Sequence, residues 1–332
     1  MKEFSYLIIG AGGTGGPIGA YLTKAGFDSR LIARGKHLSA MQEQGLLLET
    51  GFAGNERVPV SAYDMESYLK KLAGAALQRP DVIFVCVKGY SLEETIPFIR
   101  AAAKPETVVI PILNIYGTGR RLQAALPELC VTDGCIYVSA NISEPGVLKL
   151  HGSIFRIVYG IPGRPADDAR LLQVAADLER AGIVPVYSAQ IEKDAMAKFS
   201  YVSAQAACGL YFHAEAGQMQ VCGGAAEAES GTSAANWETE PRALFIELCR
   251  EIEELAGAEG IRYETPLWET NLRILDGLAP TASTSMQRDI YAGKQSEIDG
   301  LIYEVVRLAD RYGLKLPAYR KAAEKFRAEK IG

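Results

Sequence analysis

A run of glycines near the N-terminus has the spacing of a phosphate-binding turn. Gly10, Gly12, Gly13 and Gly15 lie in the segment GAGGTG, which is a G-x-G-x-x-G pattern. In such a turn the first glycine permits a tight bend, the second lets the backbone approach a pyrophosphate, and the third lets a helix pack closely on a strand. The amide groups that begin the following helix then face the anion. The pattern predicts a dinucleotide site; the alternative is a glycine-rich turn without a ligand.

Two cations follow the second predicted strand, where a dinucleotide would carry its adenosine ribose. The strand ends in LIARGK, which contains Arg34 and Lys36 and no carboxylate to bind a free ribose hydroxyl. Arginine can hold a phosphate through two hydrogen bonds and stack on adenine, and lysine adds a point charge. We therefore expect NADPH/NADP+ as the cofactor rather than NADH. The alternative is that Arg34 is a solvated surface cation.

The elements around these residues predict an α/β domain. Short apolar runs alternate with helical stretches, as in a parallel sheet with crossover helices. A helix over 18–25 follows the glycine run. The expected strands are 6–9, 29–33, 82–87, 108–113, 134–140, 155–160 and 183–187.

After Tyr187 the pattern changes to helices, with apolar residues at helical spacing and no β-branched runs. The expected helices are 191–212, 240–257, 266–278 and 295–312. We predict an α/β domain over 1–188 and an all-α domain over 189–332. Residues 214–236 are small, acidic and interrupted by glycines, which favours a surface excursion over a functional lid.

The composition excludes several classes of protein. The 332 residues carry 35 basic and 40 acidic side chains, a net charge of −5, so the broad basic surface of a nucleic-acid binder is not expected. No apolar run approaches the ~20 residues that span a bilayer, and the N-terminus enters a strand without room for a signal peptide. Six cysteines lack a Cys-x-x-Cys pair, which argues against a disulfide framework or a zinc site. We expect a cytoplasmic enzyme with no nucleic-acid or membrane partner.

The motifs, taken together, resemble those of the ketopantoate reductases. The matching segments are Gly10–Gly15, LIARG at 31–35, Val87-Lys88, Asn114, Pro145-Gly146, Lys198, and S-M, D-I and E-I-D between Ser285 and Asp299. The resemblance covers nearly the whole chain. It implies a Rossmann-type domain followed by a helical domain, with the active site in the cleft. It also implies NADPH-dependent reduction of 2-dehydropantoate to pantoate in pantothenate biosynthesis, or of a closely related 2-oxo acid.

The resemblance also assigns roles to single residues. Lys88 would help hold the adenosine phosphate end, and Asn114 would lie near the nicotinamide, although the family's Gln-Asn-Gly segment is Leu-Asn-Ile here. Lys198 would be the general acid, Glu297 its carboxylate, and Ser285 the group that binds the substrate carboxylate. Hydride addition to a keto carbon leaves negative charge on oxygen, which an ammonium group can stabilise and protonate. The alternatives are an ordinary solvated helix lysine and an exposed glutamate.

Three substrate-binding asparagines of the family are absent. Val202 and Ala206 stand four and eight residues after Lys198, and Ala282 stands three before Ser285. We therefore expect a more apolar pocket that accepts alkyl 2-oxo acids nearly as well as ketopantoate. The nearby polar residues that could partly replace the amides are Ser203, Gln205 and Thr284.

Other functions stay open at this stage. One is an NADPH-binding sensor or regulator without turnover, which the retention of Lys198, Ser285 and Glu297 argues against. Another is a dehydrogenase of a different class that acts on amino or hydroxy acids. The substrate is expected to be a small molecule, and a homodimer is left open. The three histidines, far apart in sequence, are expected to be structural: His37, His151 and His213.

Overall fold

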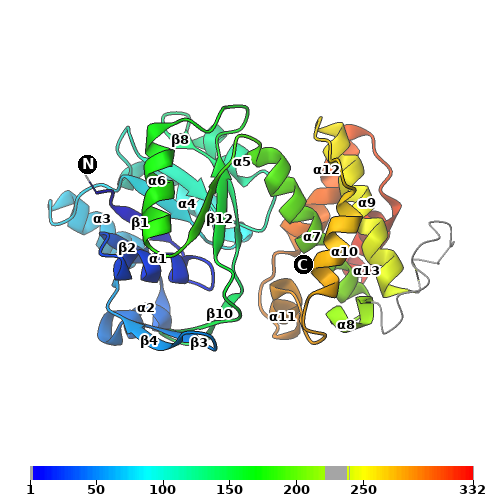
Figure 1. The fold of residues 1–332 in the computed structure, drawn as a ribbon, viewed down its shortest axis with the longest axis horizontal. Helices are drawn as coiled ribbons and strands as arrows, with labels where there is room; N and C mark the ends of the chain where they lie inside the picture. The colour runs from blue at the N-terminus through cyan, green and yellow to red at the C-terminus, as the bar shows by residue number, and fades with distance from the viewer. Residues whose placement is uncertain (1–2, 221–237, 239, 332) are drawn as a thin grey trace. The chain divides into compact units, whose positions relative to one another are not determined.

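The computed structural model of the chain describes residues 3–220, 238 and 240–331 and is shown as a ribbon in Figure 1. Its contacts define two compact units. The units comprise Met1–Leu113 with Gly117–Ala195, and Asn114–Tyr116 with Met196–Gly332. The short segment Asn114–Tyr116 thus groups with the C-terminal half, which its place in the sequence does not suggest. The two domain limits given above stay a prediction.

A six-stranded parallel sheet forms the centre of the first unit. Its order is β5-β2-β1-β6-β7-β8, and every neighbouring pair runs parallel. Side chains alternate between two cores on opposite faces, with Tyr6 and Ile8 in one and Leu7 and Ile9 in the other. Burial on both faces explains the continuous apolar runs, and the α/β class is confirmed. The strands are β1 (Tyr6–Ile9), β2 (Ser29–Ile32), β5 (Ser61–Tyr63), β6 (Val82–Val85), β7 (Val108–Pro111) and β8 (Cys130–Val131).

Helices connect these strands. α1 (Gly15–Lys24) packs on β1 and β2 and begins three residues before the helix expected at 18–25. Gly15, Gly16 and Pro17 open it, and their low helix propensity hides this first turn from the periodicity. The other connecting helices are α2 (Gly35–Gln44), α3 (Met65–Ala73), the 3₁₀ turn η1 (Gly89–Ser91), α4 (Leu92–Ala102) and α5 (Thr118–Ala125).

Two smaller sheets complete the first unit. The expected strands 134–140, 155–160 and 183–187 are present as β9 (Asp133–Tyr137), β12 (Arg156–Gly160) and β13 (Val184–Tyr187), but they form a sheet of their own in the order β13-β12-β9. α6 (Ala169–Arg180) packs against β13. A four-stranded sheet in the order β10-β11-β3-β4 was not predicted. Its strands are β3 (Leu46–Thr50), β4 (Gly54–Val58), β10 (Ala140–Glu144) and β11 (Val147–Leu150).

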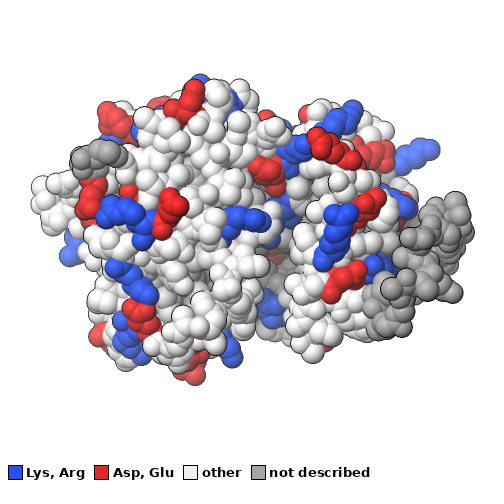
Figure 2. Space-filling model, in the orientation of Figure 1, with Lys and Arg blue, Asp and Glu red and all other residues white. Residues whose placement is uncertain are grey.

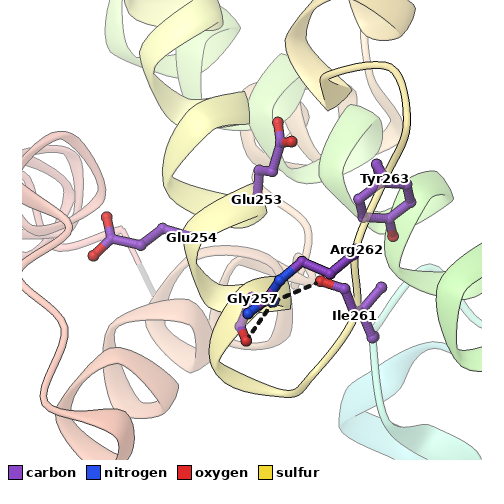
Figure 3. Close-up of a pocket in the computed structure, with 6 residues that line it drawn as sticks. All are labelled: Glu253, Glu254, Gly257, Ile261, Arg262 and Tyr263. Atoms are coloured by element: carbon purple, nitrogen blue, oxygen red, sulfur yellow. Dashed lines mark hydrogen bonds between the residues drawn. The ribbon is translucent and has the colours of Figure 1, made fainter.

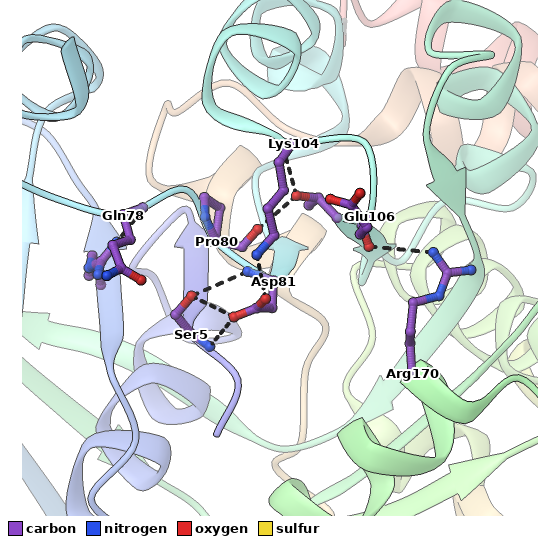
Figure 4. A network of polar contacts seen from close by, with 9 residues as sticks. Ser5, Gln78, Pro80, Asp81, Lys104, Glu106 and Arg170 are labelled. Atoms are coloured by element: carbon purple, nitrogen blue, oxygen red, sulfur yellow. Dashed lines mark hydrogen bonds and ion pairs between the residues drawn. The ribbon is translucent and has the colours of Figure 1, made fainter. Parts of the chain in front are cut away.

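A polar network joins the amino ends of β1 and β6 (Figure 4). The backbone N–H and the hydroxyl of Ser5 each donate to Asp81 Oδ2 at 2.9 Å, and Lys104 Nζ lies 2.5 Å from Asp81 Oδ1. Burial would raise the pKa of Asp81, but the hydrogen bonds from Lys104 and Ser5 hold that pKa below its usual value. This edge of the sheet is therefore closed by internal contacts, whereas the glycine run follows the opposite, carboxyl end of β1.

The second unit is helical. α9 packs against α8, α10, α12 and α13. The helix expected at 295–312 instead begins with a π-helical turn, η2 (Asp299–Tyr303), and the preceding residues from 292 to 297 are not helical. Of the stretch 214–236, α8 is described and 221–236 lie outside the described residues. The helices are α7 (Ile191–Tyr211), α8 (Ala216–Met219), α9 (Pro241–Ala258), α10 (Leu267–Asp276), α11 (Ser285–Tyr291), α12 (Glu304–Tyr312) and α13 (Pro317–Ala328).

A buried carboxylate fixes the start of α13. Glu251 of α9 accepts the backbone N–H groups of Ala318 and Tyr319 at 2.7 and 2.8 Å. Burial raises the pKa of Glu251 to about 7, and the two N–H donors oppose this shift only in part. The carboxylate joins two helices of the core but is destabilised when it is charged.

The surface carries both signs of charge. Figure 2 shows basic and acidic side chains interspersed on the face in view. Several are paired, such as Arg242 with Asp276 at 2.8 Å and Arg307 with Asp299 at 2.9 Å. Among the helices described here, none combines the length and apolar character needed to cross a membrane.

Candidate active site

The glycines after β1 meet three different structural needs. Gly10 has φ +98°, and a Cβ there would lie 2.8 Å from the Cys86 carbonyl oxygen. A Cβ on Gly15 would lie 2.7 Å from Ile8 Cγ2, so glycine lets α1 approach the sheet. At Gly12, apart from its two neighbours in the chain, no described residue comes within 4 Å of a Cβ position, so the backbone there borders open space. These are the bend, the close packing and the open approach that a dinucleotide turn requires.

Gly13 differs from its neighbours. A Cβ there would lie 2.9 Å from the carbonyl carbon of Ala140, so this glycine is packed against the start of β10. Its role in binding a cofactor remains a prediction. The N-cap of α1, Thr14, makes no side-chain capping bond, and the first turn of α1 carries no acidic residue. The positive end of the helix dipole is therefore not offset by a carboxylate in that turn.

The basic residues that the sequence singled out follow neighbouring strands. Arg34 and Lys36 come after β2 and are exposed, and Lys88 comes after β6 and is half-buried. β2 and β6 flank β1, whose carboxyl end leads into the glycines. Ligands of doubly wound sheets bind at the carboxyl ends of such strands. The topology thus brings the predicted cofactor residues of the first unit to one sheet edge.

His37 holds the glycine turn in place through two hydrogen bonds, a role that the sequence did not predict. The Gly146 N–H donates to its Nδ1 at 3.0 Å, so the proton lies on Nε2, which donates to the Ala11 carbonyl at 2.9 Å. The ring therefore ties the turn after β1 to the turn between β10 and β11. The role is structural, as expected for the histidines, but it acts on the candidate cofactor loop.

The second unit contains all four predicted catalytic and substrate residues. Lys198 lies on α7 and Ser285 opens α11, both half-buried. Glu297 is 5% exposed, so the alternative of an exposed glutamate is wrong. Asn114 belongs to this unit through the segment Asn114–Tyr116.

Contacts of the next two residues bring the Asn114 segment to the elements of Lys198 and Glu297. The Tyr116 ring lies 5.9 Å from the ring of Phe199, the residue after Lys198. Ile115 packs on Gly300, three residues after Glu297, where a Cβ would lie 2.7 Å from Ile115 Cγ1. The Tyr116 hydroxyl also donates to Glu259 at 2.7 Å.

Ser203 and Thr284, which could replace the missing amides, already make hydrogen bonds within the fold. Ser203 is fully buried, donates to the Leu301 carbonyl at 2.6 Å and lies 2.6 Å from the Tyr319 hydroxyl. Leu301 lies in the π-helical turn, so Ser203 holds the turn that follows Glu297. Thr284 is the N-cap of α11 and forms a capping box with Gln287. Both hydroxyls are therefore engaged within the fold, and a contact of either with substrate stays a prediction.

A shallow cavity of about 280 Å³ lies elsewhere in the second unit, at the end of α9 (Figure 3). Arg262 at its rim donates to the Gly257 carbonyl at 2.6 Å, and Glu253 accepts the Leu267 N–H at 2.9 Å. None of the predicted site residues lines it. The lining residues are Glu253, Glu254, Gly257, Ile261, Arg262 and Tyr263.

Within the described ranges, no group of three or more histidine, cysteine, aspartate or glutamate side chains is arranged to hold a metal ion. Cys86, Cys208 and Cys249 form no disulfide, and Cys222 lies outside those ranges. Burial raises the pKa of the Cys86 thiol. This thiol, beside Gly10 and Gly15, therefore packs as a neutral group.

Comparison with known proteins identifies relatives along the whole chain. The family model "Ketopantoate reductase PanE/ApbA" matches residues 6–163, and its C-terminal counterpart matches residues 191–329. The chain is 26% identical to the uncharacterized oxidoreductase YkpB of Bacillus subtilis over 94% of both chains. It is 23% identical to the 2-dehydropantoate 2-reductase of Aquifex aeolicus over 98% of this chain and 97% of that protein.

Solved structures share the fold. A PanE/ApbA family ketopantoate reductase from Ralstonia eutropha JMP134 has a TM-score of 0.80 and 26% identity, with 97% of both chains covered. A D-mandelate dehydrogenase solved with NADH and anilino(oxo)acetate has a TM-score of 0.78, 18% identity and 97% coverage of both chains. A dimeric ketopantoate reductase from Staphylococcus aureus has a TM-score of 0.77 and 20% identity, covering 99% of this chain and 100% of that one. The last two show similarity of fold alone.

Proposed function

We propose that this chain, which belongs to the ketopantoate reductase PanE/ApbA family of oxidoreductases, reduces a 2-oxo acid to a 2-hydroxy acid with NADPH. Full-length relatives from Aquifex aeolicus and Pyrococcus horikoshii are 2-dehydropantoate 2-reductases. The first substrate to test is therefore 2-dehydropantoate, whose reduction gives pantoate for pantothenate biosynthesis.

The first unit would hold the cofactor at the carboxyl ends of β1, β2 and β6. Gly10, Gly12 and Gly15 would admit the pyrophosphate to the start of α1, where backbone amides can donate to it. Arg34 would form a bidentate contact with the adenosine phosphate, and Lys36 or Lys88 would add positive charge. NADPH, once bound, supplies the hydride that adds to the keto carbon.

The second unit would hold the substrate. The hydroxyl of Ser285 would donate to the substrate carboxylate, and the Asn114 amide would orient the keto group. The Lys198 ammonium would donate its proton to the keto oxygen as the hydride arrives, and solvent would then reprotonate the neutral amine. Glu297, buried next to the π-helical turn, would orient Lys198.

One observation carries this proposal. The segment Asn114–Tyr116 groups with the second unit and not with the residues on either side of it in the sequence. Ile115 packs on Gly300, three residues after Glu297, and Tyr116 packs on Phe199, the residue after Lys198. This packing supports a shared site, because it brings together the three segments that carry Asn114, Lys198 and Glu297, which are far apart in the sequence.

The cofactor assignment is tested by titrating NADPH and NADH into wild type and Arg34→Ala. Loss of charge-assisted hydrogen bonds to the phosphate should weaken NADPH by about 10–100-fold, and NADH by less than about threefold. Arg180→Ala is a matched control, because Arg180 is exposed and pairs with Glu3 at 3.4 Å, near the amino ends of the strands. Equal affinity of the wild type for both cofactors would overturn the assignment.

A second candidate is a reductase of 2-oxo acids with an apolar side chain. Val202, Ala206 and Ala282 at the amide positions favour it. Comparison of an aromatic, a branched alkyl and a hydroxylated 2-oxo acid as substrates distinguishes the two.

A homodimer, like that of the Staphylococcus aureus protein, is tested by light scattering.

A further inference from the structure

One face of α7 connects the residues of the proposed substrate site. Lys198, Val202, Gln205 and Gly209 stand at positions i, i+4, i+7 and i+11 of this continuous helix. Residues at this spacing lie along one face. Ser203, by contrast, stands five residues after Lys198 and packs toward Leu301 and Tyr319. The face with Lys198 is therefore distinct from the face that packs on η2 and α13.

The far end of this face is covered by α11. Gln287 of α11 packs on Gly209, where a Cβ would lie 2.5 Å from Gln287 Nε2, and Gln287 donates to the Ala214 carbonyl at 2.9 Å. Ser285 stands two residues before Gln287 in the same short helix. Gln205 therefore lies between Lys198, about 10 Å away along the helix axis, and the packing point of α11, about 6 Å away.

The side chain of Gln205 is buried without a partner. The residue is 7% exposed, and its amide makes no hydrogen bond with any described residue. Buried amides are normally hydrogen-bonded. The fully enclosed polar side-chain atoms that lack a partner in the described chain are the hydroxyls of Tyr68 and Tyr201. The Gln205 amide is not among them, so its polar atoms are not fully enclosed by the described chain.

We propose that Gln205 determines substrate specificity by binding a hydroxyl group on the side chain of the 2-oxo acid. A glutamine amide donates and accepts, which matches a hydroxyl group, and the half-buried Val202, three residues before it, would contact the alkyl carbons. Gln205 thus stands between the two positions where the family carries asparagines and supplies the amide that they lack. This inference rests on the proposed function, and it predicts a hydroxylated substrate rather than the plain alkyl 2-oxo acid.

The test compares kcat/KM for 2-dehydropantoate and for its deoxy analogue, in which hydrogen replaces the hydroxyl. The wild type should prefer 2-dehydropantoate by roughly tenfold or more, as expected for one or two hydrogen bonds. Gln205→Met keeps the length of the side chain and should reduce the ratio to about one, by lowering kcat/KM for 2-dehydropantoate alone. Gln190→Met is the matched control, because Gln190 is exposed just before α7. Its ratio should equal that of wild type.

Stability separates this role from a structural one. Because the Gln205 amide has no partner in the fold, Gln205→Met should keep or raise the melting temperature. A lower melting temperature with an unchanged substrate ratio would overturn the assignment of Gln205. Absence of NADPH oxidation with either acid would instead overturn the proposed function, and this inference with it. Turnover of both acids with equal efficiency by the wild type would overturn the inference and leave the reductase proposal standing.

Discussion

Removal of the His37 ring should loosen the candidate cofactor loop without altering the choice of cofactor. In His37→Ala the Ala11 carbonyl and the Gly146 N–H both lose their side-chain partner. Ala11 is only 3% exposed, so water replaces the lost hydrogen bond poorly there. The turn that carries Gly10 and Gly12 would then be held by the backbone alone.

The size of the effect follows from the two hydrogen bonds. Each neutral hydrogen bond contributes about 1 kcal/mol, so their joint loss should cost about 1–2 kcal/mol in ordering the turn. If cofactor binding must restore that order, NADPH affinity falls by about 5–30-fold. NADH affinity should fall by the same factor, because His37 does not discriminate between the two adenosine ends.

Calorimetric titration of both dinucleotides measures this effect. His37→Asn places an acceptor near the position of Nδ1, His37→Gln places a donor near that of Nε2, and each should show about half of the loss. His151→Ala is the control, because His151 is exposed and bonds Asn141 at 2.7 Å. Affinity within twofold of wild type for His37→Ala, or a changed ratio of NADPH to NADH affinity, would refute the reasoning.

Three further predictions address the acid, the turn and the helical core. Lys198→Ala should lower kcat by about 10²–10⁴-fold with NADPH affinity unchanged, and turnover within a few-fold of wild type would contradict its role as general acid. Gly15→Ala should lower the melting temperature by several degrees, because α1 must move away from β1. Gly12→Ala should leave the melting temperature unchanged and weaken the binding of NADPH. Equal melting temperatures for the two variants would contradict the packing argument. The pKa of Glu251 is raised from 4.5 to about 7, so its stabilising contribution is complete below pH 4.5 and is lost as the pH rises through 7. The change in stability caused by Glu251→Gln should therefore be about 1–3 kcal/mol more favourable at pH 8 than at pH 5 in urea titrations, and an equal change at both would contradict the shift.

The parts of the fold that the sequence predicts are those with strong local patterns. β1 occupies the expected residues 6–9, because its four apolar residues are buried on both faces. β4 escaped detection because its sequence, GNERV, is mostly exposed and polar and is ordered by pairing with β3. The helix expected from 295 was too long, because apolar spacing does not register the loop from 292 to 297 or the π-helical turn after it. Non-local pairing and backbone irregularities leave weak signals in periodicity.

The residues of the candidate site were likewise predictable only where a local pattern carries the information. The glycine spacing anticipates the distinct environments of Gly10, Gly12 and Gly15, since each follows from backbone sterics. The contacts of His37 could not be predicted, because they join a side chain to backbone groups of Ala11 and Gly146, the latter 109 residues away. The direction of Ser203 could have been found from its spacing, since position i+5 lies off the helix face that carries Lys198.

The central claim is that the chain reduces a 2-oxo acid with NADPH. The most direct test follows NADPH absorbance with purified protein and a panel of 2-oxo acids that includes 2-dehydropantoate and its deoxy analogue. The account predicts oxidation of NADPH that depends on the acid, is fastest with 2-dehydropantoate, and is abolished in Lys198→Ala. Tight binding of NADPH without oxidation by any acid of the panel would contradict the account and favour an NADPH-binding sensor.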